Sequence, residues 1–288
     1  MTDKDSDLPS PPAGEKLQKV LARLGLGSRR ELERAIVKGR IKVNGKVASL
    51  GDRVELTDRV EVDGKRIRLM TKNSKPLRVL LYNKPEGQIC SHSDPEGRPT
   101  VFDNLPHLKG ERWVAVGRLD FNTSGLLLFT TDGELANRLM HPASVIDREY
   151  LVRIQGDVDE DMKNRLREGI LLDDGPAKFT DIVDAPGASR NPWFYCVLMQ
   201  GRNREVRRLW ESQGVKVSRL KRVRFGSIFI PSHVRSGQWI ELNHKEVKDL
   251  CLSAGVEVPP QPSTATPAQQ KAAQRHQRKL RAGKSRRV

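Results

Sequence analysis

The chain of 288 residues contains little cysteine and few aromatic residues. Its three cysteines, Cys90, Cys196 and Cys251, lie far apart with no Cys-x-x-Cys spacing. This distribution argues against a structural zinc site and for a reducing compartment. The chain has no run of 18 apolar residues and no apolar stretch after its N-terminus, so we expect neither a membrane span nor a secretory signal. A cytoplasmic location without a membrane partner is therefore expected.

Basic residues outnumber acidic ones by 52 to 36, which gives a formal net charge of +16. Such an excess is typical of proteins that bind a polyanion, most often nucleic acid. Acids are absent from residues 260–288, where eight basic residues carry half of the net charge. We interpret 257–288 as a disordered basic tail and the polar, proline-containing segment 1–13 as a disordered N-terminus.

A small basic α/β module is expected at 14–73. Apolar residues at helical spacing over 17–24 predict one helix, and Ser28-Arg29-Arg30-Glu31 has the pattern of a capping box that begins a second. An Asn-Gly turn within 41–47 predicts a hairpin. Basic side chains gather at the start and end of the second helix, which favours phosphate contacts over a merely solvated face. The expected RNA contacts of this module are Arg29, Arg30 and Arg34.

A larger domain is expected at 76–256, after a linker at 71–75. Its strand-like runs and sparse helices predict an α+β domain with a mixed, mostly antiparallel extended sheet flanked by helices. The short apolar run 126–130 is bounded by turn formers and predicts a buried strand. Residues 148–154 alternate, which places Tyr150 on one face with the apolar side chains that follow it.

One acid stands close behind an arginine in the segment 117–125, which ends at the buried strand. Turn formers surround this acid, Asp120, so we expect it on a loop anchored in the core sheet. Catalytic side chains are often displayed on such loops, although many loop aspartates only cap helices or close turns. Asp120 alone therefore does not distinguish a catalytic role from a structural one, and other segments of the chain have to decide between them.

A second cluster of charge lies at 201–210. Asn203 is a good N-cap for a helix in which Arg207 and Arg208 occupy the first turns. The helix dipole disfavours cations there, and this conflict indicates a partner carboxylate or phosphate. A basic strand follows and includes Arg219 and Arg222.

These segments resemble the ordered motifs of pseudouridine synthases, specifically the group named after the ribosomal small subunit enzyme. The similar segments are 83–87 (first motif), 117–133 (catalytic motif), 148–152 (tyrosine motif) and 201–208 (arginine motif). Residues 14–62 resemble the small RNA-binding domain first seen in a small-subunit ribosomal protein. Further runs at 94–103, 132–142 and 205–210 resemble the members that act on the large ribosomal subunit. The resemblance covers about residues 15–256.

The resemblance implies that uracil is detached from its ribose and reattached through C5, without a cofactor and without a metal. Asp120 would act as nucleophile or base, with Arg207 as its salt-bridge partner and Tyr150 stacked on the base. A stacked uridine has to be flipped out first, and Arg118 matches the residue that fills the vacated space. The other expected RNA contacts of the domain are Lys84, Arg202, Arg204, Arg208, Arg219 and Arg222.

The implied partner is 23S rRNA or a large-subunit precursor, bound by a monomer, with a target uridine near the peptidyl transferase region. Two alternatives stay open: a non-catalytic rRNA-binding factor of ribosome assembly, and a paralogous synthase that acts on another rRNA uridine. A metal-dependent nuclease is disfavoured, because it would require several clustered acids where this region offers one acid backed by arginines.

Overall fold

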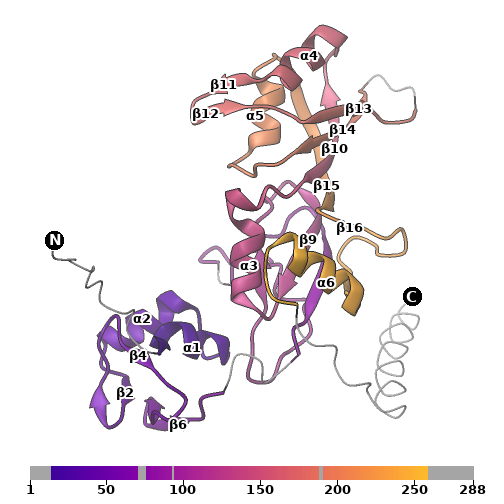
Figure 1. Cartoon of the computed structure of the whole chain (residues 1–288). Helices are drawn as coiled ribbons and strands as arrows, with labels where there is room; N and C mark the ends of the chain where they lie inside the picture. Colours follow the sequence, from indigo (N-terminus) through magenta and orange to yellow (C-terminus); the bar gives the residue numbers. More distant parts are fainter. Residues whose placement is uncertain (1–13, 71–75, 93, 188–190, 259–288) are drawn as a thin grey trace, which may run out of the picture. The chain divides into compact units, whose positions relative to one another are not determined.

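A computed structural model describes residues 14–70, 76–92, 94–187 and 191–258 of the chain (Figure 1). The N-terminal segment predicted at 1–13 and the linker predicted at 71–75 lie outside the described residues, as does all but the first two residues of the predicted basic tail.

Two helices and two small antiparallel sheets form the first part of the chain. In one sheet β1 pairs with β4, and in the other the strand order is β3-β2-β5-β6. The elements are β1 (Glu15–Lys16), α1 (Leu17–Arg23), α2 (Arg29–Val37), β2 (Ile41–Val43), β3 (Lys46–Val47), β4 (Arg53–Val54), β5 (Val60–Val62) and β6 (Lys65–Ile67).

Local sequence rules account for this part. The capping box predicted at the start of α2 is confirmed, because the Glu31 N–H donates to Ser28 Oγ and the Ser28 N–H donates to the Glu31 carboxylate. The predicted hairpin turn is confirmed as well. Asn44 and Gly45 have φ angles of 51° and 83°, as the mirror-image turns of tight hairpins require. Leu17, fully buried at the start of α1, belongs to the core that these elements enclose.

A nine-stranded sheet dominates the second part of the chain. Its strands are β7 (Val79–Lys84), β8 (Val114–Val116), β9 (Ser124–Thr130), β10 (Arg148–Gln155), β13 (Asp181–Asp184), β14 (Trp193–Leu198), β15 (Lys216–Phe225), β16 (Ile228–Phe229) and β17 (Trp239–Glu241). The other elements are α3 (Gly133–Met140), a 3₁₀ turn (Pro142–Ser144), α4 (Glu160–Glu168), the hairpin β11 (Ile170–Leu172) and β12 (Gly175–Ala177), α5 (Glu205–Glu211) and α6 (His244–Ser253).

The strand order β13-β14-β10-β15-β9-β7-β17 divides this sheet into two halves. All its described pairings are antiparallel except the one between β15 and β9, where only Lys221 with Ser124 and Arg222 with Gly125 are paired. We call this short parallel pairing the seam. A Cβ atom on Gly125 would lie 2.2 Å from the backbone oxygen of Arg222, so the strands approach this closely only because residue 125 is glycine. The predicted mixed, mostly antiparallel sheet is confirmed.

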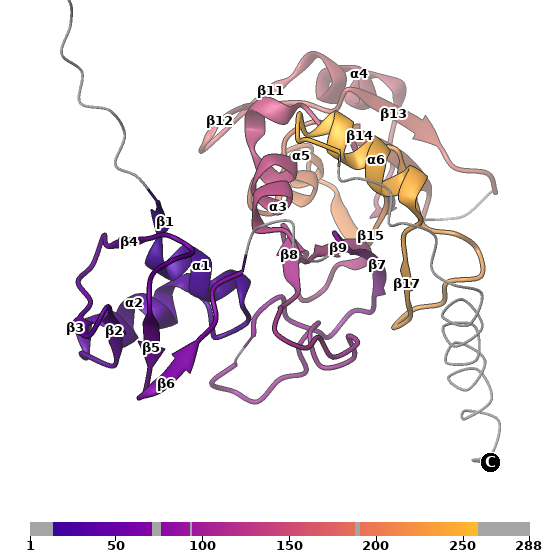
Figure 2. The same cartoon turned by 60° about the horizontal axis from the view of Figure 1, so that its bottom comes forward.

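Each half of the sheet has its own helices and its own core. Figures 1 and 2 show α4 and α5 beside β10, β13 and β14, and α3 beside β8 and β9, with α6 next to α3. Trp210 of α5 is fully buried between Phe179 and Phe194 in one core. Phe129 of β9 is fully buried in the other. The cores therefore hold the strand ends on both sides of the seam in place.

Candidate active site

The loop between β8 and β9 carries Asp120 and is held from below by a buried lysine. The Lys84 ammonium donates to the backbone oxygens of Asp120 (3.1 Å) and Thr123 (2.8 Å), and Lys84 has no exposed surface. Burial lowers the pKa of Lys84 from its ordinary value. The prediction that Lys84 contacts RNA is therefore wrong: its donors point at loop carbonyls that would otherwise be buried without partners.

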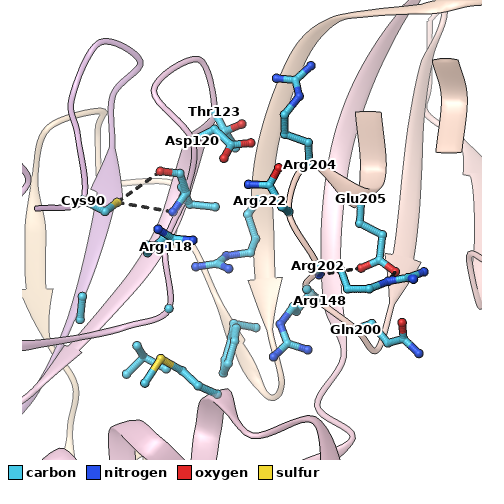
Figure 3. Close-up of a pocket in the computed structure, with 18 of the residues that line it drawn as sticks. Cys90, Arg118, Asp120, Thr123, Arg148, Gln200, Arg202, Arg204, Glu205 and Arg222 are labelled. Atoms are coloured by element: carbon cyan, nitrogen blue, oxygen red, sulfur yellow. Dashed lines mark hydrogen bonds and ion pairs between the residues drawn. The ribbon is translucent and has the colours of Figure 1, made fainter. Parts of the chain in front are cut away.

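A thiol fixes the same loop from the other side. The Leu119 N–H donates to Cys90 Sγ (3.4 Å), and the thiol lies 3.3 Å from the Leu119 oxygen, to which it donates (Figure 3). Burial raises the pKa of Cys90, so this group is a neutral structural thiol at physiological pH. Cys90 is partly buried against the core that contains Phe129, and Cys196 is fully buried in the core that contains Trp210.

Asp120 itself is half-buried and faces the cleft with its carboxylate (Figure 3). Among the residues that the structure describes, none forms an ion pair with it. The side-chain oxygens of Asp120 are therefore open to whatever enters the cleft.

Arg207 supports the loop without touching the acid. It is 7% exposed and donates from Nη2 to the backbone oxygen of Asn122 and from Nη1 to that of Val217, both at 2.9 Å. The direct salt bridge predicted between Arg207 and Asp120 is therefore absent from the described contacts, and this prediction is wrong. Burial lowers the pKa of Arg207, and the negative charge of Asp120 acts in the opposite direction. The arginine thus connects α5 to the loop and leaves the carboxylate open.

Tyr150 lies on β10, where the predicted face alternation is confirmed. Tyr150, Val152 and Ile154 are all buried, while the residues between them are only partly so. In the sheet Tyr150 stands opposite Arg222 of β15, across the seam from the Asp120 loop. The ring lines the same cleft as Asp120.

The arginine motif before α5 is held mainly by protein acids. Helix α5 begins one residue later than predicted, with Arg204 rather than Asn203 as its N-cap, in the left-handed conformation and without a side-chain cap. Arg208 makes two 2.8 Å bonds to the Asp174 carboxylate of the β11–β12 hairpin. Arg202 reaches the same carboxylate and the buried Glu205. The partner carboxylate expected from the dipole conflict is therefore present, while RNA contacts of these arginines stay a prediction.

The cleft around Asp120 has a volume of about 920 Å³, at the upper end of the range of about 300–1,000 Å³ that is typical of ligand sites. Of the predicted residues it brings together Asp120, Tyr150, Arg118, Arg202, Arg204 and Arg222. Arg118 is exposed at the entrance of the loop, as a residue that moves into RNA would have to be. Arg219 lies elsewhere, in a smaller cleft with Trp193.

Arg148 also lines this cleft, and sequence reasoning missed it. It is 8% exposed and has the same strand parity as Tyr150, so the alternation of residues 148–154 already placed it on the buried face. A charged residue at a buried position in that pattern was the available indication.

The described part of the chain has neither a cluster of metal-ligand side chains nor a membrane-spanning helix. No group of three or more histidine, cysteine, aspartate or glutamate side chains there is arranged to hold a metal ion. Among the same residues, no helix is both long and apolar enough to cross a bilayer.

The family model of RNA pseudouridylate synthases matches residues 78–212, and the model of the S4 domain matches residues 15–60. A protein of Pseudomonas aeruginosa named "Ribosomal large subunit pseudouridine synthase B" is 58% identical over 94% of this chain and 70% of its own length. The chain belongs to the RNA pseudouridylate synthase family. The resemblance to the group named after the small-subunit enzyme is thereby confirmed.

Other members of the synthase family agree. A Vibrio cholerae protein of the same name is 54% identical over 95% of this chain and 85% of its own length. A crystal structure of a pseudouridylate synthase matches 82% of this chain and 99% of that chain, with a TM-score of 0.58 and 25% identity. The match extends over both parts of this synthase, and most residues of the cleft described above lie within the region that the synthase family model matches, with Arg222 beyond it.

Proposed function

We propose that this synthase converts one uridine of 23S rRNA, or of a large-subunit precursor, into pseudouridine. The proposal is carried by the identity of 52–58% to several relatives whose name specifies the large ribosomal subunit. The small module at 14–73 would hold the rRNA through the exposed side chains of Arg29, Arg30 and Arg34 on α2, and the domain at 76–256 would perform the chemistry.

The reaction is an isomerisation, so every atom of the uridine is retained. The bond between N1 and C1′ breaks, a bond between C5 and C1′ forms, C5 loses its proton, and N1 takes up a proton. A carboxylate can start this sequence as nucleophile at the sugar or as base, and both roles suit Asp120 because its carboxylate has no described protein partner.

The geometry also suits a flipped base. Tyr150 presents its ring to the cleft and can stack on the uracil, while exposed Arg118 stands two residues before the acid. A uridine drawn out of an RNA stack costs a few kcal/mol, and a side chain in the vacated space offsets part of this cost. We assign Arg118 to that position.

The test is a map of pseudouridine in both rRNAs from a strain that lacks this protein. We expect one 23S position to lose its modification, and we expect the wild-type gene but not an Asp120→Asn gene to restore it. Loss of a 16S position instead would assign the chain to another branch of the family. An unchanged map would remove the rRNA assignment, and full restoration by Asp120→Asn would remove the role of Asp120.

A further inference from the structure

Two buried arginines at the floor of the cleft have no role in the chemistry described above. Arg222 of β15 is 3% exposed, and Arg148 of β10 is 8% exposed. Neither forms an ion pair with an acid of the described chain. Buried charges in proteins are normally paired or hydrogen-bonded, so this pair requires an explanation.

Arg222 uses only a small part of its hydrogen-bonding capacity. Its Nε donates to the backbone oxygen of Leu126 at 2.7 Å, and this is its one described protein bond. Nη2 is buried with no partner, although a guanidinium has five N–H donors. A buried donor without a partner costs about the desolvation of that group, and the cost is larger for a charged group.

Arg148 is held so that its charge stays next to that of Arg222. Its Nη1 donates to the backbone oxygens of Ile146 and Met199, and a Cβ on Gly201 would lie 3.3 Å from its Nε. The guanidinium carbons of Arg148 and Arg222 lie 5.2 and 5.4 Å from the centre of the same Phe225 ring. Burial lowers the pKa of Arg148, and the charge of Arg222 adds to this effect.

Other buried or half-buried arginines of the domain use more of their guanidinium donors than Arg222 does. Arg207 donates to two backbone oxygens, Arg208 binds Asp174, and Arg224 binds Glu149 and Asp147, although the Nε atoms of Arg207 and Arg208 are also buried without a partner. Of the two acids in the cleft, Glu205 is bound by Arg202. The other acid, Asp120, lies to the left of Glu205 in Figure 3. It stands higher in that view than the guanidinium groups of Arg118, Arg222 and Arg148. The floor of the cleft therefore carries positive charge that the described chain does not neutralise.

We propose that Arg148 and Arg222 bind a phosphodiester group of the RNA strand at the target uridine. This inference rests on the proposed action on rRNA. A phosphodiester carries a full negative charge, whereas the uracil ring is neutral before reaction, and planar guanidinium groups match phosphate oxygens. Because Arg222 stands opposite Tyr150 in the sheet, a phosphate held there lies beside the base that stacks on Tyr150. The pair thereby sets how far the nucleotide enters the cleft.

The decisive experiment changes the RNA and leaves the fold of the protein intact. RNA fragments that the wild-type enzyme converts are made with one neutral methylphosphonate, placed 5′ or 3′ of the target uridine or four nucleotides away. Binding is measured with full-length Asp120→Asn protein, so that no turnover occurs. We expect one of the two adjacent neutral linkages to weaken binding about tenfold, equivalent to roughly 1.4 kcal/mol, and the remote one to have little effect.

A matched pair of variants tests which arginine is responsible. In Asp120→Asn/Arg222→Gln the sensitive linkage should cause no further loss, because the contact is already missing. In Asp120→Asn/Arg78→Gln, where the altered arginine is paired with Glu241 of β17 at the end of the strand order and does not line the cleft, the tenfold loss should persist. Circular dichroism melting of each variant shows whether it is folded. Arg222→Lys serves as a second variant that keeps the charge, and there we expect part of the tenfold sensitivity to remain.

The outcomes separate this site from the proposed function. If the wild type converts the RNA and both adjacent neutral linkages bind normally, the phosphate site is overturned and the function stands. The phosphate site is also overturned if Arg222→Gln lowers kcat with unchanged affinity and unchanged sensitivity to the linkage, which would indicate a contact with uracil. If the wild type converts no rRNA fragment, both proposals are overturned.

Discussion

The ammonium nitrogen of Lys84 lies 3.1 Å from the backbone oxygen of Asp120, so a fully buried cation stands directly beneath the acid of the cleft. The contact is to the main chain and not to the carboxylate. Lys84 therefore fixes where Asp120 stands while leaving its side chain open to the substrate.

Replacement of Lys84 by methionine should lower both stability and activity. The carbonyls of Asp120 and Thr123 would lose their donor, and each buried acceptor left without a partner costs about 1–3 kcal/mol. Since two acceptors are affected, chemical denaturation should show a loss of about 2–6 kcal/mol. We expect kcat to fall more than KM rises because the acid is displaced. A variant with normal kcat would show that the lysine does not position the loop.

Arg207→Lys should impair turnover although the charge is retained. The guanidinium joins the carbonyls of Asn122 and Val217 simultaneously, and a single ammonium cannot reproduce this fork. We expect kcat to fall about 10–100-fold, equivalent to about 1.4–2.7 kcal/mol. The control is Arg165→Lys on the exposed face of α4, where one bond to Gln213 is lost and turnover should be unchanged. Equal kcat in the two variants would contradict the bridging role.

Gly125→Ala should prevent assembly of the sheet. The new Cβ would lie 2.2 Å from the Arg222 oxygen, and φ at this position is +105°. The steric clash and the strained backbone angle together should cost more than about 4 kcal/mol, the level of the most severe single substitutions. Gly133→Ala is the matched control: no atom lies within 4 Å of its Cβ and it stands at the first position of α3, so its melting temperature should stay equal or rise. Expression of soluble, active Gly125→Ala protein would contradict the close approach.

The ion pair of Asp94 and Arg98 should give a defined pH dependence. Hydrogen bonds from the Arg98 guanidinium lower the pKa of Asp94 to about 2. A lowered pKa contributes stability that is complete above the unfolded value of about 3.9 and is lost as the pH falls toward 2. The difference in melting temperature between wild type and Asp94→Asn should thus be equal at pH 7 and pH 5 and smaller at pH 3. A constant difference at all three would contradict the assignment.

Sequence patterns predicted the elements well where the cause is local. The capping box of Ser28, the hairpin turn at Asn44 and the alternation around Tyr150 all depend on neighbours within a few residues, and the structure contains each of them. The order of the motifs predicted the family, and six of the thirteen predicted site residues lie in one cleft.

The errors concern partners that belong to the main chain. Lys84 and Arg207 bind carbonyl oxygens brought near by the fold, and every residue has a carbonyl, so no residue pattern marks these contacts. The N-cap at Arg204 was missed because this residue caps without its side chain and in the left-handed conformation, which is uncommon for a residue other than glycine. Arg148 could have been found, since it shares the buried parity of Tyr150.

The candidate active site spans the seam between β9 and β15, so a measurement of activity reports whether the two halves of the sheet are still joined. Asp120 comes from one half of the sheet, and Tyr150, Arg207 and Arg222 come from the other, yet the strand pairing between the halves has only two residue pairs, supplemented by side-chain bonds such as those of Arg207 and Arg222. Neither half contains a complete site. We therefore expect heat to extinguish catalysis when the halves separate, while the aromatic core around Trp210 still gives native fluorescence. Enzymatic inactivation would then be an early sensor of unfolding in this protein, ahead of the spectroscopic transition.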